Sequence, residues 1–149
     1  MDRFPSPLEV KSTSPLQPQE SAFILQSRDT IRAILETETE RKLCIVGPCS
    51  IHDIPSALEY ADKLKRLQER VEDTFLLVMR CYIEKPRTQL GWKGLLYDPF
   101  LDGSGNVKEG IQLARTLLIR LAEMQVPAAT EIIDPFLVNY FEDLIAWGC

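Results

Sequence analysis

Four basic side chains lie close together in the sequence between residues 80 and 94: Arg80, Lys85, Arg87 and Lys93. The only acidic residue among them is Glu84. A guanidinium binds a phosphate or a carboxylate through paired hydrogen bonds, and an ammonium supplies a point charge. In a chain whose net charge is -5, this group of cations indicates a binding site for phosphorylated or carboxylated anions. Lys93 is expected on a solvated loop.

Arg80 ends an apolar run in which it alternates with Leu76 and Val78. The alternation predicts that Arg80 points to the same side of a strand as these two core residues. A guanidinium in that position needs partners, because it cannot lose its proton. An internal salt bridge with Glu131 is one interpretation, and the two cations that follow within seven residues favour an external anion instead.

Cys49 follows a Gly47-Pro48 turn. Its thiol fits simple packing, a nucleophile or a soft metal ligand. His52 stands three residues further on, a spacing that could form half of a zinc site. Because His52 and Asp53 open a helix, we favour a capping or hydrogen-bonding role for His52 over metal ligation. This is the only histidine in the chain, and the residues assemble no catalytic triad.

The remaining sequence predicts alternating strands and helices. Residues 1–19 are rich in Pro, Ser and Gln, which predicts an extended arm. The repeated strand–helix order predicts parallel strands with crossover helices, and therefore an α/β fold. The expected elements are a helix at 21–40, a strand at 43–47, a helix opened by Asp53, a strand at 75–83, a loop at 84–106, a third helix, a strand at 126–133, a short helix at 135–145 and the start of a fourth strand at 146–149.

This order of elements places the reactive side chains together. Parallel α/β folds carry their chemistry at the carboxyl ends of the strands, in open sheets and in barrels alike. Cys49 and the basic residues both follow strands, so we expect them at the same edge of the sheet. The residues alone therefore predict an anion-binding α/β enzyme with a metal-assisted mechanism as one option.

Composition narrows the class of protein further. The 149 residues are 45% hydrophobic, which suits one globular domain with a core. A pI near 5.0 argues against nucleic acid as the main partner. No signal sequence opens the chain, and its apolar runs are far below the roughly 20 residues that span a bilayer. The four cysteines show no C-x-x-C pairing, which predicts reduced thiols in the cytoplasm.

Four segments resemble class I 3-deoxy-D-arabino-heptulosonate-7-phosphate (DAHP) synthases. They are "IVGPCSIHD", "VMRCYIEKPRTQLGWKGLLYDPFLDGS", "EGIQLARTLL" and "VPAATEIIDP…DLIAWG". The resemblance extends from about Leu8 to Cys149, and "GPCSIHD" with "EKPRT" is highly specific. These enzymes join phosphoenolpyruvate to erythrose 4-phosphate at the start of the shikimate pathway. The sibling synthase that makes an eight-carbon sugar acid lacks the KPRT pattern and ranks well below.

The resemblance implies roles for individual residues. It assigns Cys49 as a ligand of a divalent metal ion, which would be Mn, Fe, Co or Zn. It assigns Arg80 and Lys85 to phosphoenolpyruvate, and Lys85 also to catalysis at the aldehyde oxygen. Residues Lys85, Pro86, Arg87 and Thr88 together resemble the erythrose 4-phosphate site. In this pattern His52 is not a metal ligand.

The resemblance also implies a (β/α)8 barrel with an N-terminal extension. Residues 1–40 would form the extension, which contributes to homo-oligomer contacts and to an aromatic amino-acid feedback site. Residues 41–149 would form the first part of the barrel, up to about its fourth strand, because a whole barrel takes about 250 residues. The other metal ligands, a histidine, a glutamate and an aspartate, are then expected beyond Cys149, and the chain alone is expected to be inactive. The alternative is a short, non-catalytic module for association or effector binding.

Overall fold

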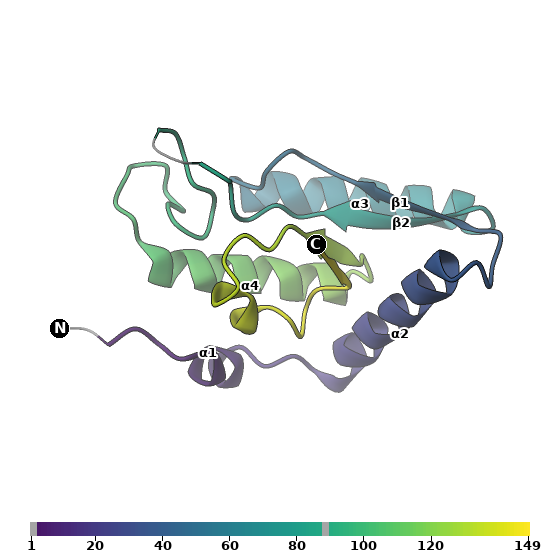
Figure 1. The fold of residues 1–149 in the computed structure, drawn as a ribbon, viewed down its shortest axis with the longest axis horizontal. Helices are drawn as coiled ribbons and strands as arrows, with labels where there is room; N and C mark the ends of the chain where they lie inside the picture. Colours follow the sequence, from purple (N-terminus) through teal and green to yellow (C-terminus); the bar gives the residue numbers. More distant parts are fainter. Residues whose placement is uncertain (1–2, 88–89) are drawn as a thin grey trace.

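The computed structural model describes residues 3–87 and 90–149 and shows one sheet of parallel strands in the order β1-β2-β3-β4 (Figure 1). The α/β fold with parallel strands that the sequence predicts is therefore confirmed. The strands are β1 (Lys42–Val46), β2 (Phe75–Arg80), β3 (Ala128–Thr130) and β4 (Trp147–Gly148), and the helices are α1 (Pro7–Thr13), α2 (Pro18–Leu35), α3 (Ile54–Val71) and α4 (Val107–Glu123).

The two faces of the sheet are covered by different helices. Alternate residues of a strand point to opposite faces. Leu77 and Met79 of β2 join the large core, to which α3 and α4 contribute. Leu76 and Val78 instead pack in a second cluster with Ile31 of α2. The central strands β2 and β3 are thus buried on both faces, as expected for parallel strands, whereas β1 and β4 are more exposed.

The helix that follows β1 begins where the sequence predicts. The Asp53 side chain accepts a hydrogen bond from the Ser56 N–H at 2.9 Å, and it satisfies one of the free donors of the first turn of α3. Pro55 fits in that turn because its missing N–H has no intrahelical partner there. This cap fixes the point at which the chain leaves the loop of Cys49.

The expectation of an extended N-terminal arm is wrong. Residues Pro7–Thr13 form α1, and Pro18 opens α2. The Ser6 and Glu9 side chains form a reciprocal capping box at the start of α1. Proline disrupts the interior of a helix but is well accommodated in its first turn. Both helices use proline in that position, so the Pro-rich composition marks helix starts rather than their absence.

Several other predicted elements are shorter in the structure. The helix predicted at 21–40 starts at Pro18 and ends at Leu35, close to Thr37 with its positive φ of 60°. The strand predicted at 75–83 ends at Arg80: the Cys81 N–H still donates to the Ala129 carbonyl of β3, but the Tyr82 carbonyl accepts the Ile51 N–H from the loop after β1. The helix predicted at 135–145 is one 3-10 turn, η1 (Leu137–Tyr140).

The N-terminal helix packs against this last turn. The Tyr140 hydroxyl donates to the Pro5 carbonyl at 2.7 Å, and Lys11 forms an ion pair with Glu142. The division into an extension (1–40) and a barrel part (41–149) stays a prediction. Over the described residues, the structure contains no helix that is long and apolar enough to cross a membrane.

Candidate functional site

Arg80 stands at the carboxyl end of β2 and is directed toward the loop that follows β1. Its Nε donates to the Pro48 carbonyl at 3.0 Å, and its Nη2 donates to the Gly47 carbonyl at 2.7 Å. The guanidinium also lies 5.3 Å from the centroid of the Tyr82 ring. Within the described part of the chain, Arg80 forms no ion pair, so the alternative of a salt bridge with Glu131 is not observed.

Gly47 makes the close approach of these two strand ends possible. A Cβ atom at this position would lie 2.5 Å from the Arg80 carbonyl oxygen and 2.9 Å from its backbone nitrogen. Neither backbone atom can move without disturbing the pairing of Val46 with Met79. A glycine at the end of β1 is therefore what allows the Arg80 guanidinium to bond to the turn beside Cys49.

Lys85 and Cys49 are in direct contact at the carboxyl ends of the strands, in agreement with the edge of the sheet that the sequence predicts for both. The Lys85 Nζ donates to the Cys49 carbonyl at 2.9 Å and lies 3.0 Å from the Cys49 Sγ. This hydrogen bond and the Lys85 charge, with further contributions from Arg80 and Arg87, lower the pKa of the exposed Cys49 thiol. A thiolate is the form of cysteine that acts as a nucleophile and as a metal ligand.

The remaining residues of the predicted site lie on the loop after β2. Pro86 and Arg87 are exposed, and Thr88 lies outside the described residues. Lys93 is also exposed, as predicted for a residue on the solvated part of the loop. Its carbonyl accepts the Lys85 N–H at 2.9 Å, so the loop folds back on itself and holds the Lys85 backbone.

His52 does not have the predicted capping or hydrogen-bonding role. Asp53 is the helix cap, and the exposed His52 ring packs edge-on against Trp92 with 6.4 Å between ring centroids. No hydrogen bond of the His52 ring is found among the described residues. The reason is that the N-cap position itself, one residue later, presents its side chain to the free N–H groups.

The site carries part of what a metal ion needs. Cys49 is an exposed thiol with a lowered pKa, which suits it as a ligand for a divalent transition metal. Among residues 3–87 and 90–149, no group of three or more His, Cys, Asp or Glu side chains could hold a metal ion together. Cys49 therefore fits as one ligand, and the described residues do not supply a complete set.

Glu84 is a buried residue next to the site that the sequence analysis did not single out. Its side chain is buried, although it lies between exposed and half-buried basic residues. Its carboxylate accepts hydrogen bonds from the Tyr97 hydroxyl and from the Ile133 N–H. The available signal was its position directly before Lys85, as the single acid in a basic segment.

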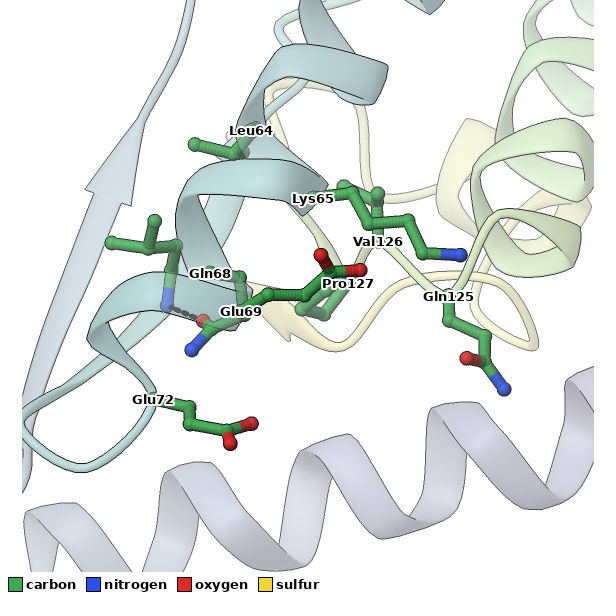
Figure 2. A pocket seen from close by; sticks show the side chains of 9 residues that line it. Leu64, Lys65, Gln68, Glu69, Glu72, Gln125, Val126 and Pro127 are labelled. Carbon is green, nitrogen blue, oxygen red and sulfur yellow. Dashed lines mark hydrogen bonds between the residues drawn. The ribbon is translucent and has the colours of Figure 1, made fainter.

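A cavity of about 170 Å³ lies elsewhere, among residues of α3 and the turn before β3 (Figure 2). Gln68 spans its wall, because its amide accepts the Leu77 N–H at 2.6 Å and donates to the Phe75 carbonyl at 3.0 Å. These are residues at the amino end of β2, whereas Arg80 stands at the carboxyl end. The charged residues that line the cavity are Lys65 and two glutamates, which makes it a poor site for an anion.

The fold and the site define an α/β protein with a cationic group beside an exposed thiol of lowered pKa, at the carboxyl ends of β1 and β2. Comparison with known proteins gives the family: residues 15–149 match the DAHP synthetase I family, and the chain belongs to it. The N-terminal part of that family's sequence is thus recognised here, as the motifs "GPCSIHD" and "EKPRT" indicate.

Individual relatives agree with this assignment. The chain is 48% identical to the Tyr-sensitive phospho-2-dehydro-3-deoxyheptonate aldolase of Escherichia coli K12, over 96% of this chain and 40% of the relative. It is 45% identical to the Trp-sensitive enzyme of the same organism, over 96% of this chain and 41% of the relative. The structure of the aldolase from Francisella tularensis superposes with a TM-score of 0.95 at 40% identity, covering 99% of this chain and 43% of that one. The chain thus spans about two fifths of the relatives it matches.

Proposed function

We propose that this chain contributes to the condensation of phosphoenolpyruvate with D-erythrose 4-phosphate, which gives DAHP and phosphate at the first step of the shikimate pathway. The observation that supports this activity most directly is the group Arg80, Lys85 and Arg87 around Cys49. These cations have no acidic partner within 4.0 Å among the described residues. Bringing two phosphorylated substrates together requires fixed positive charge of this kind.

The proposed roles follow from chemistry and contact geometry. Arg80 holds phosphoenolpyruvate. Its two bonds to carbonyls use only two of the five N–H groups of a guanidinium, and the others can donate to the substrate. Lys85 binds the same substrate and donates a proton or hydrogen bond to the aldehyde oxygen as negative charge develops there. Lys85, Pro86, Arg87 and Thr88 form the erythrose 4-phosphate site.

Cys49 would hold a divalent metal ion, one of Mn, Fe, Co or Zn, together with ligands outside the described set. When bound, such an ion supplies Lewis-acid stabilisation for a developing oxyanion. The contribution of this chain is to favour the thiolate form of the Cys49 sulfur by lowering its pKa. Lys85 does so through the contact of its ammonium with the sulfur at 3.0 Å.

The architecture and regulation are proposed on the same basis. The parallel sheet would form the first part of a (β/α)8 barrel, with residues 1–40 as an extension that contributes to homo-oligomer contacts. The relatives are described as Tyr-sensitive and Trp-sensitive. We therefore propose an aromatic amino acid as the effector of this protein as well. A cytoplasmic location stays a prediction from the cysteine pattern.

The test replaces one cation at a time. Residues 1–149 are joined to the part of the E. coli Tyr-sensitive relative that lies beyond the matched segment, and phosphoenolpyruvate consumption is assayed with erythrose 4-phosphate and manganese. Lys85→Ala should cost about 2–4 kcal/mol of transition-state stabilisation, because it leaves an anion without its charged partner. Lys93→Ala, which removes an exposed charge from the same loop, is the control and should cost much less. Equal losses in the two variants would refute the assignment.

A further inference from the structure

Glu84 is buried to an extent that is unusual for a carboxylate. Only 5% of the residue is exposed, although acidic residues are rarely buried unless they are paired. Burial, with a contribution from the charge of Asp134, raises the pKa of Glu84, while three hydrogen bonds act in the opposite direction. A group in this environment has to be held by specific donors, since an unsatisfied buried carboxylate is costly.

The Glu84 donors come from two segments that are remote in the sequence. The Oε2 atom accepts the Ile133 N–H at 3.2 Å and the Asp134 N–H at 3.5 Å, both from the turn after β3. The Oε1 atom accepts the Tyr97 hydroxyl at 3.3 Å. Tyr97 also lies 3.4 Å from an Asp134 oxygen, so the two carboxylates share its single O–H donor. Glu84 therefore joins the end of β2 to two other segments.

The return of the loop depends on Gly94. This residue has a φ of 106°, and a Cβ atom there would lie 2.5 Å from the Ile83 carbonyl oxygen and 2.8 Å from the Glu84 Cα. On one side of this contact, the Leu96 N–H donates to the Ile83 carbonyl at 3.1 Å. On the other side, the Lys85 N–H donates to the Lys93 carbonyl at 2.9 Å. The backbone around Glu84 and Lys85 is consequently fixed from both sides.

Glu84 and Lys85 are neighbours whose side chains contact different parts of the molecule. The Glu84 carboxylate reaches the turn after β3, and the Lys85 ammonium reaches the Cys49 carbonyl and sulfur after β1. Any shift of the Glu84 backbone is therefore passed directly to the Lys85 Cα. A displacement of about 1 Å in a catalytic group can change a rate by roughly 100-fold.

We propose that Glu84 is a positioning residue, which clamps the loop after β2 to the turn after β3 so that the Lys85 ammonium stands beside Cys49. This inference rests on the proposed function, because it assumes that Lys85 binds a substrate. Removal of the carboxylate leaves the Ile133 and Asp134 N–H groups without their side-chain acceptor, and the Tyr97 hydroxyl keeps only its Asp134 contact. The loop then shifts to solvate them, and Lys85 moves with it.

A double-mutant cycle tests this role in the metal-loaded chain joined to the E. coli relative. The measured quantity is the Kd for phosphoenolpyruvate, by isothermal titration calorimetry, for the parent, Glu84→Ala, Lys85→Ala and the double variant. Glu84→Ala should raise Kd about tenfold in the parent and less than about twofold in the Lys85→Ala background, because residues that act as a unit are not additive. Glu84→Gln, whose amide oxygen still accepts the two backbone N–H groups, should stay within about threefold of the parent.

The controls separate positioning from a general loss of stability. Asp143→Ala removes another partly buried carboxylate, the partner of Arg115, and should lower the Tm without changing Kd. If Glu84→Ala does not fold, Tyr97→Phe replaces it in the cycle, with about a threefold effect expected in the parent only. The positioning role is overturned if the Glu84 substitution raises Kd by the same factor in both backgrounds, or if it leaves the Kd of the parent unchanged. An unchanged Kd and kcat in Lys85→Ala instead overturns the proposed function.

Discussion

Two arginines of this molecule, Arg115 and Arg80, are held in contrasting ways. Arg115 on α4 is 1% exposed and donates to both oxygens of Asp143, at 2.9 and 2.8 Å. It also donates to the carbonyls of Ser14 and Tyr140. Arg80 is half-buried and is bonded to two carbonyls, without a carboxylate among its described partners.

The difference separates a structural arginine from one that is available to bind a ligand. The charge of Arg115 is neutralised inside the protein, and its hydrogen bonds fasten α4 to α1 and η1. The charge of Arg80 is oriented by two neutral carbonyls, and the Lys85 ammonium contacts the Cys49 carbonyl and sulfur; neither cation has a carboxylate partner among the described residues. A bound anion would therefore gain a preorganised partner at Arg80, whereas four of the five Arg115 N–H groups are already bonded and its charge is paired with Asp143.

Of the substitutions around Arg80, Cys49→Ala has the largest expected effect. In the metal-loaded chain joined to the E. coli relative, it should lose the metal ion and the activity together, because the Cys49 thiolate is the proposed ligand. The far-ultraviolet circular dichroism spectrum should stay unchanged, since Cys49 is exposed. Metal analysis of the purified variant measures the outcome. Full metal content in an inactive Cys49→Ala protein would assign the thiol to another role.

Arg80→Ala and Arg115→Ala test the comparison directly. In the same chain, Arg80→Ala should lower kcat/KM, with a loss of about 2–4 kcal/mol in transition-state stabilisation. The free energy of unfolding should stay nearly unchanged. Arg115→Ala should do the reverse, with a loss of about 3–5 kcal/mol in the free energy of unfolding, because it strands a partly buried carboxylate. Steady-state kinetics and urea denaturation measure the two quantities. If both variants lost kcat/KM and stability to the same extent, the distinction between a ligand-binding Arg80 and a structural Arg115 would be wrong.

The smallest expected effect is the loss of folding stability at low pH that comes from the ion pair of Arg115 with Asp143. Burial acts to raise the pKa of Asp143, but the hydrogen bond and charge of Arg115, with the charge of Lys11, outweigh it and lower that pKa. A carboxyl with a folded pKa below its unfolded value stabilises the fold above about pH 4, and this contribution is lost as pH falls further. Thermal unfolding between pH 3 and 6 should show a smaller pH dependence for Asp143→Asn than for the parent. Parallel curves would show that Asp143 does not carry the effect.

The predictions from sequence were most accurate where local chemistry decides the structure. Asp53 was correctly expected to cap α3, because an N-cap acts on amides three residues away. The arm was misjudged, because composition does not say whether a proline stands in the first turn or in the interior of a helix. The length of β2 also depended on partners elsewhere, since Tyr82 bonds to Ile51 rather than to the strand ladder.

For the candidate site, the sequence by itself determined the residue types and their common edge. Parallel strands must end at one edge, so the contact of Lys85 with Cys49 agrees with a prediction made from the order of elements. Only the tertiary structure decided that Glu84 is buried and that Arg80 bonds to the Gly47-Pro48 turn. Both facts depend on contacts between segments separated by 32 to 50 residues. Such contacts follow from how strands and loops pack, because no local periodicity or spacing encodes the position of a distant backbone amide or carbonyl.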